Sequence, residues 1–288
     1  LVQIESPSRA EAGMAARCER ELTDLGFYVE FDDSGDKTGA NVGNLIAHLP
    51  GTRPGHVVLS AHMDTVQPCE GIEPVVVDGV IRSAGQTILS ADDKAGVAAI
   101  FEAVRALLEE DTPRPDITVV LTTCEELSLL GAGALDLARV PSDAPYFIFD
   151  ADGAPGTVIL GAPCHNTFEA HFTGRAAHAG VEPEAGISAI QMAAHAVANM
   201  SLGRLDEATT ANVGVIEGGS ETNVVPDSCM MKGECRSLYA DRAQACITAM
   251  TEALEAAAAH FGGSVDYTWR EDYGAVRYEE TDDLVAHI

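Results

Sequence analysis

Basic residues are scarce in this sequence. Of its 288 residues, 17 are lysine or arginine and 45 are aspartate or glutamate, so the formal net charge at pH 7 is −28. Nucleic acids and anionic membrane surfaces bind proteins through positive potential. We therefore expect no nucleic acid and no membrane as partners, and metal cations or small zwitterionic molecules fit the charge better. Outside the acidic clusters described below, the acids are expected to form a solvated surface.

Long apolar runs and paired cysteines are also missing. No run approaches the roughly 18 apolar residues of a membrane-spanning helix, and the first five residues lack the basic start of a signal peptide. The seven cysteines are scattered, odd in number and include no C-x-x-C pair, so neither a disulfide framework nor a thiolate zinc site is indicated. We expect a protein of the reducing cytoplasm.

What is present is the composition of a folded α/β protein. Hydrophobic residues make up 46% of the chain, and its length favours two domains. Helices are predicted at about 8–25 and 94–110, where apolar residues recur at helical spacing. Buried strands are predicted for the short apolar runs at 27–31, 43–49, 56–61, 117–123, 146–149 and 157–160.

The pattern changes after Pro163. Strands are predicted at 167–173, 212–217, 230–238 and 264–270, and helices at 187–200 and 240–261. This β-α-β-β-α-β order predicts a small open sandwich, in which two helices cover an antiparallel sheet, inserted as a second domain.

Residues that bind metals recur at the ends of the predicted strands. His62 and Asp64 lie two positions apart, so a strand would point both side chains to one face. The other acids at strand ends or tight turns are Asp92-Asp93, Glu125-Glu126 and Asp150. Strand ends at one edge of an open α/β sheet form a crevice, the usual ligand position in such folds. Buried like charges repel one another unless cations lie among them, so this ordered set predicts a metallohydrolase.

Each of these places has a plain structural explanation when taken alone. His62 could be a hydrogen-bonded core histidine, and Asp92 could be a helix N-cap. Glu125-Glu126 could form the first turn of a helix, and Asp150 could be a turn residue. The hypothesis is therefore their convergence.

Six strings of this sequence, in order along nearly the whole chain, resemble one known family. They are S-A-H-M-D-T-V, L-S-A-D-D-K-A-G, T-C-E-E-L-S-L-L-G-A, F-D-A-D-G-A-P-G, F-T-G-R-A-A-H-A-G-V-E-P-E-A-G-I-S-A-I and G-G-S-E-T-N-V-V-P-D. They are similar to the di-zinc exopeptidase family of peptidase T, carboxypeptidase G and the aminoacylases, and most similar to its peptidase T-like branch. The resemblance implies a zinc-exopeptidase-like α/β sandwich as the catalytic domain, over residues 1–164. It also implies an inserted α+β two-layer lid and dimerisation domain over 165–275, with 276–288 starting the return to the catalytic domain.

The resemblance also implies a metal ligand set. His62 and Asp150 would hold one zinc ion, Asp92 would bridge the two ions, and Glu126 would belong to the second. Two dications would nearly neutralise these carboxylates together with one hydroxide. Relatives further suggest a cis peptide bond between Asp92 and Asp93.

Further residues would bind or activate the reactants. Asp64 would orient the ring of the histidine ligand, and Glu125 would be the general base for the attacking water. On extended backbone adjacent side chains diverge, so Glu125 would face the water while its neighbour binds metal. His178 would stabilise the oxyanion, often in the active site of the partner subunit. Asn223 and Arg236 would bind the carboxylate or backbone of the substrate, and an ordinary salt bridge is the open alternative for Arg236.

The sequence departs from the family at its C-terminal end. The family histidine that completes the second metal site has no counterpart before Ile288, and His287 falls in a predicted helix start. The resemblance therefore implies a C-terminally truncated catalytic domain with one firm zinc site and one incomplete site. It also implies an exposed edge of the catalytic sheet. We expect this chain alone to be weakly active or inactive.

These expectations define a zinc-dependent aminopeptidase of peptidase T type that hydrolyses short peptides such as tripeptides and forms a homodimer through its lid domain. An N-acyl-amino-acid or dipeptide hydrolase with the same metal chemistry stays open, as does a non-catalytic relative. A nucleotide oxidoreductase would rest on Gly131-Ala132-Gly133, but Asp136 occupies the place of the third glycine. Residues 150–153 begin like a calcium loop but lack its later acidic clamp.

Overall fold

The computed structural model describes residues 1–288, except for the side chain of His287. The chain forms two compact units that divide between Thr157 and Val158, and each unit has its own sheet and its own apolar core. All seven cysteines are buried free thiols. In the described part of the chain, no helix has the length and apolar character needed to cross a membrane.

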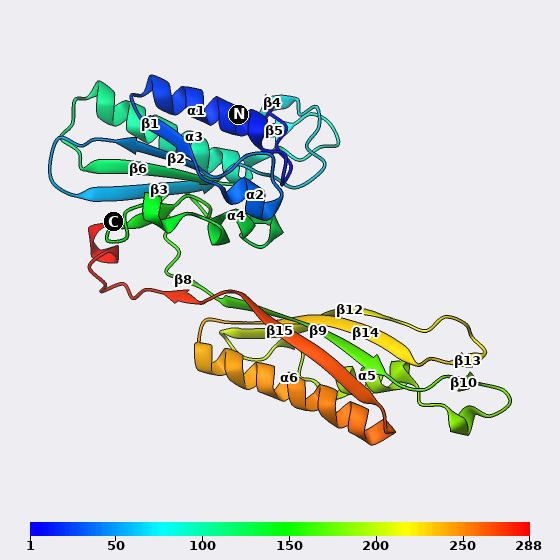
Figure 1. The fold of residues 1–288 in the computed structure, drawn as a ribbon. Helices are drawn as coiled ribbons and strands as arrows, with labels where there is room; N and C mark the ends of the chain where they lie inside the picture. The colour runs from blue at the N-terminus through cyan, green and yellow to red at the C-terminus, as the bar shows by residue number, and fades with distance from the viewer. The chain divides into compact units, whose positions relative to one another are not determined.

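The first unit is built on a five-stranded mixed sheet with the order β1-β2-β6-β3-β7 (Figure 1). β3 lies parallel to its neighbours β6 and β7, whereas β2 lies antiparallel to β1 and β6. The bounds of these strands are Tyr28–Phe31 (β1), Leu45–Leu49 (β2), His56–His62 (β3), Asp116–Thr122 (β6) and Tyr146–Ile148 (β7). β2 and β6 are buried along almost their whole length, which explains their nearly continuous apolar sequences.

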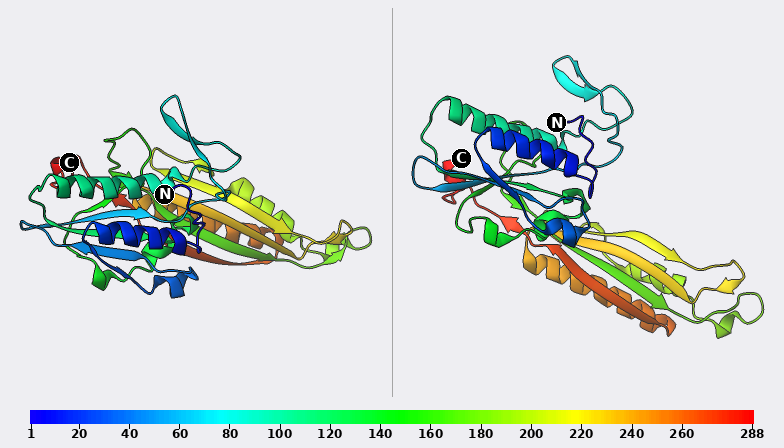
Figure 2. Two further views of the ribbon diagram at one scale, coloured as in Figure 1. Left: turned by 90° about the horizontal axis from the view of Figure 1, so that it is seen from above. Right: turned by 45° about the horizontal axis from the view of Figure 1, so that its top comes forward.

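Two helices cover one face of this sheet and pack together (Figures 1 and 2). α1 spans Ala12–Asp24 and α3 spans Ala91–Glu109, and Arg105 of α3 forms an ion pair with Glu21 of α1 at 3.3 Å. The shared core combines buried side chains of both helices with those of β2, β3 and β6. The opposite face carries a smaller cluster made by Ile46, Val58, Val120 and Val140. Short helical turns complete the unit: α2 (Ser34–Thr38), η1 (Glu125–Leu127), α4 (Leu130–Gly133) and η2 (Leu137–Arg139).

The strand register brings the candidate residues to one edge of the sheet. His62 is the last residue of β3 and lies opposite Thr122, the last residue of β6. Ser60 of β3 lies opposite Ile148, the last residue of β7, so Asp150 follows that strand directly. Since β3, β6 and β7 run in the same direction, their carboxyl ends open onto the same side.

The second unit is a five-stranded antiparallel sheet with the order β11-β12-β14-β9-β15. Helices α5 (Ala189–Asn199) and α6 (Ala240–Phe261) cover one of its faces (Figure 1), with Phe168, Met192 and Leu254 in the core between them and the sheet. The strand bounds are Cys164–Thr173 (β9), Gly203–Arg204 (β11), Thr209–Gly218 (β12), Ser228–Ser237 (β14) and Ser264–Tyr273 (β15). The predicted mixed α/β class with a second two-layer unit is confirmed.

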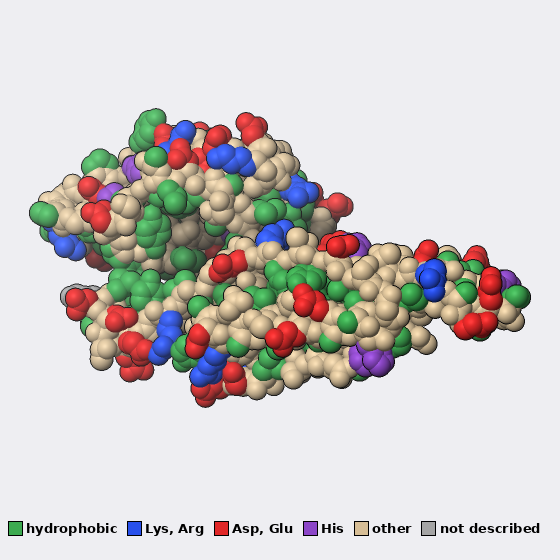
Figure 3. Space-filling view, turned by 60° about the horizontal axis from the view of Figure 1, so that its bottom comes forward, with side chains coloured by type: hydrophobic (Ala, Val, Ile, Leu, Met, Phe, Trp, Pro, Cys, Tyr) green, Lys and Arg blue, Asp and Glu red, His purple; other side chains and the backbone are tan. Residues whose placement is uncertain are grey.

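Short ribbons and turns accompany this sheet. β10 (Ala177–His178) pairs with β13 (Val224–Val225), and β8 (Gly161–Ala162) pairs with β16 (Val276–Arg277). The single turns are η3 (Pro183–Ala185) and η4 (Val285–His287). On the face drawn in Figure 3, acidic side chains are spread over the surface rather than gathered in one patch, as expected for a solvated acidic surface.

One sequence expectation about local structure is wrong, and one element was not predicted. The run 157–160, predicted to be a strand, is irregular, because it connects the two units, and Val158 and Ile159 are exposed. A hairpin of β4 (Pro74–Val77) and β5 (Val80–Ser83) was not predicted, although its turn, Asp78-Gly79, has the residue types that favour a two-residue hairpin loop.

Strand β7 forms one edge of the first sheet. Among the described strands it pairs with β3 alone, and Ile148 on it is 68% exposed.

Candidate metal centre

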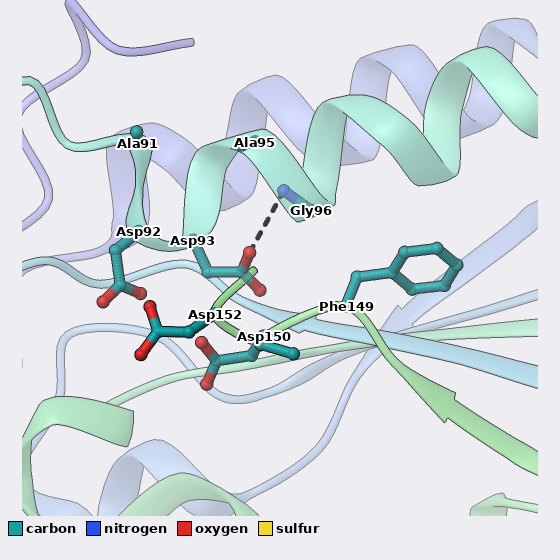
Figure 4. Close-up of a pocket in the computed structure, with 9 residues that line it drawn as sticks. Ala91, Asp92, Asp93, Ala95, Gly96, Phe149, Asp150 and Asp152 are labelled. Carbon is teal, nitrogen blue, oxygen red and sulfur yellow. Dashed lines mark hydrogen bonds between the residues drawn. The ribbon is translucent and has the colours of Figure 1, made fainter. Parts of the chain in front are cut away.

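A hollow of about 330 Å³ opens at the carboxyl ends of the strands of the first unit. Its walls are the first turn of α3 and the loop after β7 (Figure 4). Gly96 permits this close approach, because a Cβ there would lie 2.6 Å from the carbonyl oxygen of Phe149. Four acidic side chains line the hollow: Asp92, Asp93, Asp150 and Asp152.

The ring of His62 lies between carboxylates. Its Nε2 is 2.9 Å from Oδ1 of Asp92 and 3.9 Å from Oε2 of Glu125, and its Nδ1 is 3.3 Å from Oδ1 of Asp64. Burial alone would lower the pKa of His62, but Asp64, Asp92 and Asp150 raise it to about 10. One imidazole therefore faces three carboxylates, those of Asp64, Asp92 and Glu125.

Two groups of donor atoms converge at this edge of the sheet. One consists of His62, Asp93 and Asp150, and the other of His62, Asp92 and Glu126; within each group the ligand atoms all lie within 4.8 Å of one another. An imidazole with carboxylate oxygens is a donor set that suits Zn²⁺ and related divalent cations. The residues at this site therefore fit one or two bound cations.

The electrostatics of the acids point the same way. Burial, together with Asp150 and Glu126, raises the pKa of Glu125 to about 7 although His62 opposes the shift. Burial and Asp92 raise the pKa of Glu126, and burial and Asp92 also raise that of Asp150. Carboxyl groups that repel one another in this way become stable as anions when a cation lies among them.

Asp92 and Asp93 have different surroundings. The side chain of Asp92 is 71% exposed and faces the hollow, so its carboxylate is accessible to a ligand. Asp93 is buried and accepts the N–H groups of His62 at 3.2 Å and Gly96 at 3.1 Å (Figure 4). Burial raises the pKa of Asp93 to about 7. The peptide bond between the two aspartates is cis, as expected.

Asp64 connects the histidine to the glutamate pair. It is fully buried, and its carboxylate accepts hydrogen bonds from Ser8 Oγ at 2.6 Å, Glu125 N at 2.9 Å and Glu126 N at 3.2 Å. Although burial opposes the shift, the adjacent ring of His62 and the hydrogen bonds from Ser8 and Glu125 lower the pKa of Asp64. A carboxylate held as an anion beside Nδ1 fixes the orientation of the ring.

The backbone at the glutamate pair differs from the expectation. Glu125 and Glu126 do not lie on extended backbone but in the 3₁₀ turn η1, after Cys124 in the left-handed conformation with φ 52°. The directions of their side chains are therefore set by the turn and not by the alternation of a strand. The reason is that β6 ends at Thr122, before the pair is reached.

The residues expected in the second domain all lie in the second unit. His178 ends β10 and pairs with Val224, and the carbonyl oxygen of Asn223 accepts the N–H of Ala179 at 2.9 Å. Nδ1 of His178 accepts the N–H of Gly180 at 3.2 Å. His178 and Asn223 are thus neighbours on one ribbon.

Arg236 lies elsewhere in this unit, on β14. Its guanidinium donates to Glu234 at 3.1 and 3.3 Å and to the hydroxyl of Tyr273 at 3.4 Å. These contacts form the salt bridge that the sequence left open as an alternative, and they hold the guanidinium in a half-buried position.

Sequence reasoning missed several residues near the site. Asp93 was recognised only as part of the cis pair, and Ser8, Glu11 and Asn44 were not recognised. The isolated acidic or polar residues of the N-terminal segment carry no motif of their own, so only their tertiary contacts reveal them. For Asp93, its position next to Asp92 was the signal in the sequence that could have indicated a role at the site.

Comparison with known proteins agrees with this geometry. A profile described as a peptidase dimerisation domain, of the M20 type, matches residues 164–261, and one described as peptidase family M28 matches residues 44–180. The uncharacterized protein YqjE of Bacillus subtilis is 43% identical over 286 residues, which are 99% of this chain and 77% of that protein. Carboxypeptidase G2 of a Pseudomonas species is 31% identical over 82% of this chain and 58% of that protein.

Two solved structures are similar over 99% of this chain. The aminopeptidase PepT of Bacillus cereus has 42% identity and a TM-score of 0.92, with 77% of its chain covered. A tripeptidase of Staphylococcus aureus has 35% identity and a TM-score of 0.94, with 76% covered. The two-unit fold and the acidic centre at the strand ends define a metal-dependent peptidase. The chain belongs to the M20 peptidase family, in the branch that contains these PepT-type enzymes.

Proposed function

We propose that this chain is a zinc-dependent aminopeptidase that hydrolyses a peptide bond of short peptides, tripeptides in particular. The observation that carries the proposal is the convergence of His62 with the carboxylates of Asp92, Glu126 and Asp150 at one sheet edge. The similarity to an aminopeptidase PepT and to a tripeptidase supports the choice of substrate.

We assign the metal ligands from the surroundings of each acid. His62 and Asp150 would hold one cation, Glu126 would hold the second, and the exposed carboxylate of Asp92 would be shared by both. The carboxylate of Asp93 accepts the backbone N–H groups of His62 and Gly96, and so it holds the backbone of the site in place and is not assigned as a ligand. When bound, the cations polarise the substrate carbonyl and acidify a water molecule. Since both donor groups share the single imidazole of His62, one cation binds firmly and the other weakly.

Glu125 moves the proton. A carboxyl group with a pKa of about 7 is poised to accept a proton from the attacking water and to return it to the leaving amine near neutral pH. Its position follows from Asp64, which holds the N–H of Glu125 and also lies beside the ring of His62. The base and the ligand are thereby oriented by the same carboxylate.

His178 stabilises the oxyanion. Because its Nδ1 accepts the N–H of Gly180, a neutral ring carries its proton on Nε2, which is then free to donate. Asn223, on the same ribbon, contacts the substrate backbone, and Arg236 binds the substrate carboxylate through the donors that Glu234 leaves unused. In the proposed homodimer, formed through the second unit, His178 serves the site of its own or of the partner subunit. The buried free thiols fit the proposed cytoplasmic location.

An N-acyl-amino-acid hydrolase is the second candidate. It is favoured by the 31% identity to carboxypeptidase G2, which covers 82% of this chain. The two activities differ in whether the substrate has a free α-amino group next to the cleaved bond. They share the metal centre, so the same residues would serve both.

A substrate panel tests the proposal. The purified chain, loaded with Zn²⁺, is assayed on tripeptides, on the same tripeptides with an acetylated N-terminus, and on N-acetyl amino acids. We expect weak cleavage, confined to the free tripeptides, loss of that activity with a chelator and its recovery on addition of Zn²⁺. Cleavage of the acetylated substrates alone would favour the second candidate. Activity that survives both complete chelation and the change His62→Ala would refute a metallopeptidase.

A further inference from the structure

Side chains from other parts of the chain hold the turn that carries Glu125 and Glu126. Their oxygens accept hydrogen bonds from four consecutive backbone N–H groups. None of these four groups donates within the ladder of β6, which ends at Thr122. The four hydrogen bonds are Thr123 N to Asn44 Oδ1 (3.0 Å), Cys124 N to Glu11 Oε1 (3.0 Å), Glu125 N to Asp64 Oδ1 (2.9 Å) and Glu126 N to Asp64 Oδ2 (3.2 Å). Three segments that are far apart in the sequence therefore determine the path of this turn.

The turn needs such support. Cys124 is fully buried and has a φ of 52°, in the left-handed region that is strained for a residue with a side chain. A buried N–H group left without an acceptor would destabilise the turn further. A strained backbone of this kind persists only where its surroundings determine it. The acceptors on Glu11 and Asn44 supply that determination on the side away from the metal centre.

Glu11 is committed to this turn. It lies at the N-cap of α1 and is fully buried, yet its side chain makes no cap hydrogen bond. Its Oε1 instead accepts the N–H groups of Arg9 and Cys124, and the thiol of Cys124 lies 3.4 Å away. Burial and the carboxylate of Glu11 raise the pKa of the Cys124 thiol to about 11, so the thiol keeps its proton and donates. A buried carboxylate is costly without such partners.

Asn44 is oriented in one way only. Its Nδ2 donates to the carbonyl oxygen of Gly131 at 2.8 Å and to Asp32 Oδ2 at 3.0 Å, which leaves Oδ1 for the N–H of Thr123. A flipped amide would set its NH₂ group against that N–H. The side chain is fully buried, so water cannot replace it.

We propose that Glu11 and Asn44 are positioning residues for the reaction, which aim Glu125 at the attacking water by fixing the turn 123–126. Neither residue touches the substrate or a cation; both act through the backbone of the residues that precede Glu125. The inference rests on the proposed function, since it assigns Glu125 the role of general base. It extends that function to the N-terminal segment, which carries no catalytic motif.

The test compares two substitutions at one position. Glu11→Met keeps the length of the side chain and removes the acceptor, whereas Glu11→Gln keeps an oxygen for the N–H of Cys124. Since a misplaced catalytic group costs on the order of 100-fold in rate, we expect Glu11→Met to lower kcat about that much, with KM unchanged. We expect Glu11→Gln to retain most of the kcat, because a neutral oxygen still accepts the hydrogen bond.

A matched control separates positioning from general destabilisation. Thr118 is fully buried on β6 and contacts His48 and His56 through its hydroxyl, away from the turn. Thr118→Val should lower the melting temperature and leave kcat unchanged. If Glu11→Met changes kcat no more than Thr118→Val does, the proposal is overturned.

Amide hydrogen exchange of residues 123–126 measures how well the N–H groups of the turn are protected, and it does not depend on catalytic activity. We expect faster exchange in Glu11→Met than in Glu11→Gln, and the slowest exchange in the unchanged protein. If Glu11→Met does not fold, the test uses the amide exchange of Glu11→Gln against that of the unchanged protein. A neutral oxygen is a weaker acceptor than a carboxylate, so the N–H of Cys124 must still exchange faster in Glu11→Gln. Unchanged protection would overturn the proposal. A parent protein that binds no metal and cleaves no peptide would instead refute the proposed function, and the exchange data would remain valid.

Discussion

Nε2 of His62 lies 2.9 Å from Oδ1 of Asp92, although the two residues are 30 positions apart in the sequence. β3 delivers the imidazole and the first turn of α3 delivers the carboxylate, and both face the same hollow. In the absence of a cation, this contact holds a proton on the ring. In the proposed metal centre, the same two side chains would be ligands of a cation.

Metal binding should release protons. In the metal-free protein the pKa of His62 is raised to about 10 and that of Glu125 to about 7, so at pH 7 the ring is protonated and Glu125 is partly protonated. A cation must displace the ring proton, and a rise in pH removes the competing protons. We expect the affinity for Zn²⁺ to rise from pH 6 to pH 8, by about tenfold per pH unit for each proton released. Calorimetric titrations in buffers with different ionisation enthalpies count these protons. An affinity that is constant over this range would contradict the assigned ligands.

Asp64 should matter for metal affinity without binding the metal. Asp64→Ala removes the anion beside Nδ1 of His62 and the acceptor for Glu125 N. Substitutions of such supporting carboxylates cost roughly 10- to 100-fold in metal affinity, and we expect a loss in that range. Asp24→Ala, at the exposed end of α1, removes the same charge and serves as the control. Equal affinities of the two variants would refute the orienting role.

Substitutions of Glu125 and of Glu126 should have different effects, the first on the rate of the reaction and the second on metal binding. Glu125→Gln cannot accept a proton, so we expect kcat to fall by about 10²- to 10⁴-fold while the bound metal is retained. Glu126→Gln should lower the metal content, because this residue is a proposed ligand. Elemental analysis and steady-state kinetics of both variants test the assignment. A Glu125→Gln variant with unchanged kcat would favour a non-catalytic relative.

Two glycines of the short helix α4 allow a matched comparison of the free energy of unfolding. A Cβ at Gly131 would lie 1.9 Å from the carbonyl oxygen of Thr123, whereas a Cβ at Gly133 meets nothing within 4 Å. We expect Gly131→Ala to lower the free energy of unfolding by about 1–3 kcal/mol, because backbone must move. Gly133→Ala should be neutral or stabilising by about 0.4–1 kcal/mol, since it only restricts the unfolded chain. Chemical denaturation measures both, and equal stabilities would contradict the close contact at Thr123.

The fold could be predicted where each element has its own periodic pattern. The helices α3 and α6 and the central strands β3 and β6 were found because burial on a defined face imposes spacing on the apolar residues. The apolar run at 157–160 has the composition of a strand but lacks a partner strand, and hydrogen bonding between strands is not written in local composition. The hairpin of β4 and β5 was missed although its turn residues favour it.

The acids of the site could be predicted because metal ligands are few in kind and follow strands. Their supports could not. Glu11 and Cys124 are 113 positions apart, and nothing near Glu11 distinguishes it from the other acids of a chain with 45. A hydrogen bond of this kind depends on distances that arise only when α1 packs against the sheet.

The amino-acid sequence by itself determined the two-unit α/β architecture and the identity of the acids at the strand ends, because periodic burial and short ligand motifs are local properties. Tertiary structure alone decided that Asp92 faces the hollow while Asp93 is buried, and that the glutamate pair sits on a turn held by four side-chain acceptors. The partners in these hydrogen bonds come from segments that are far apart in the sequence. Their relative positions follow from the packing of the helices against the sheet.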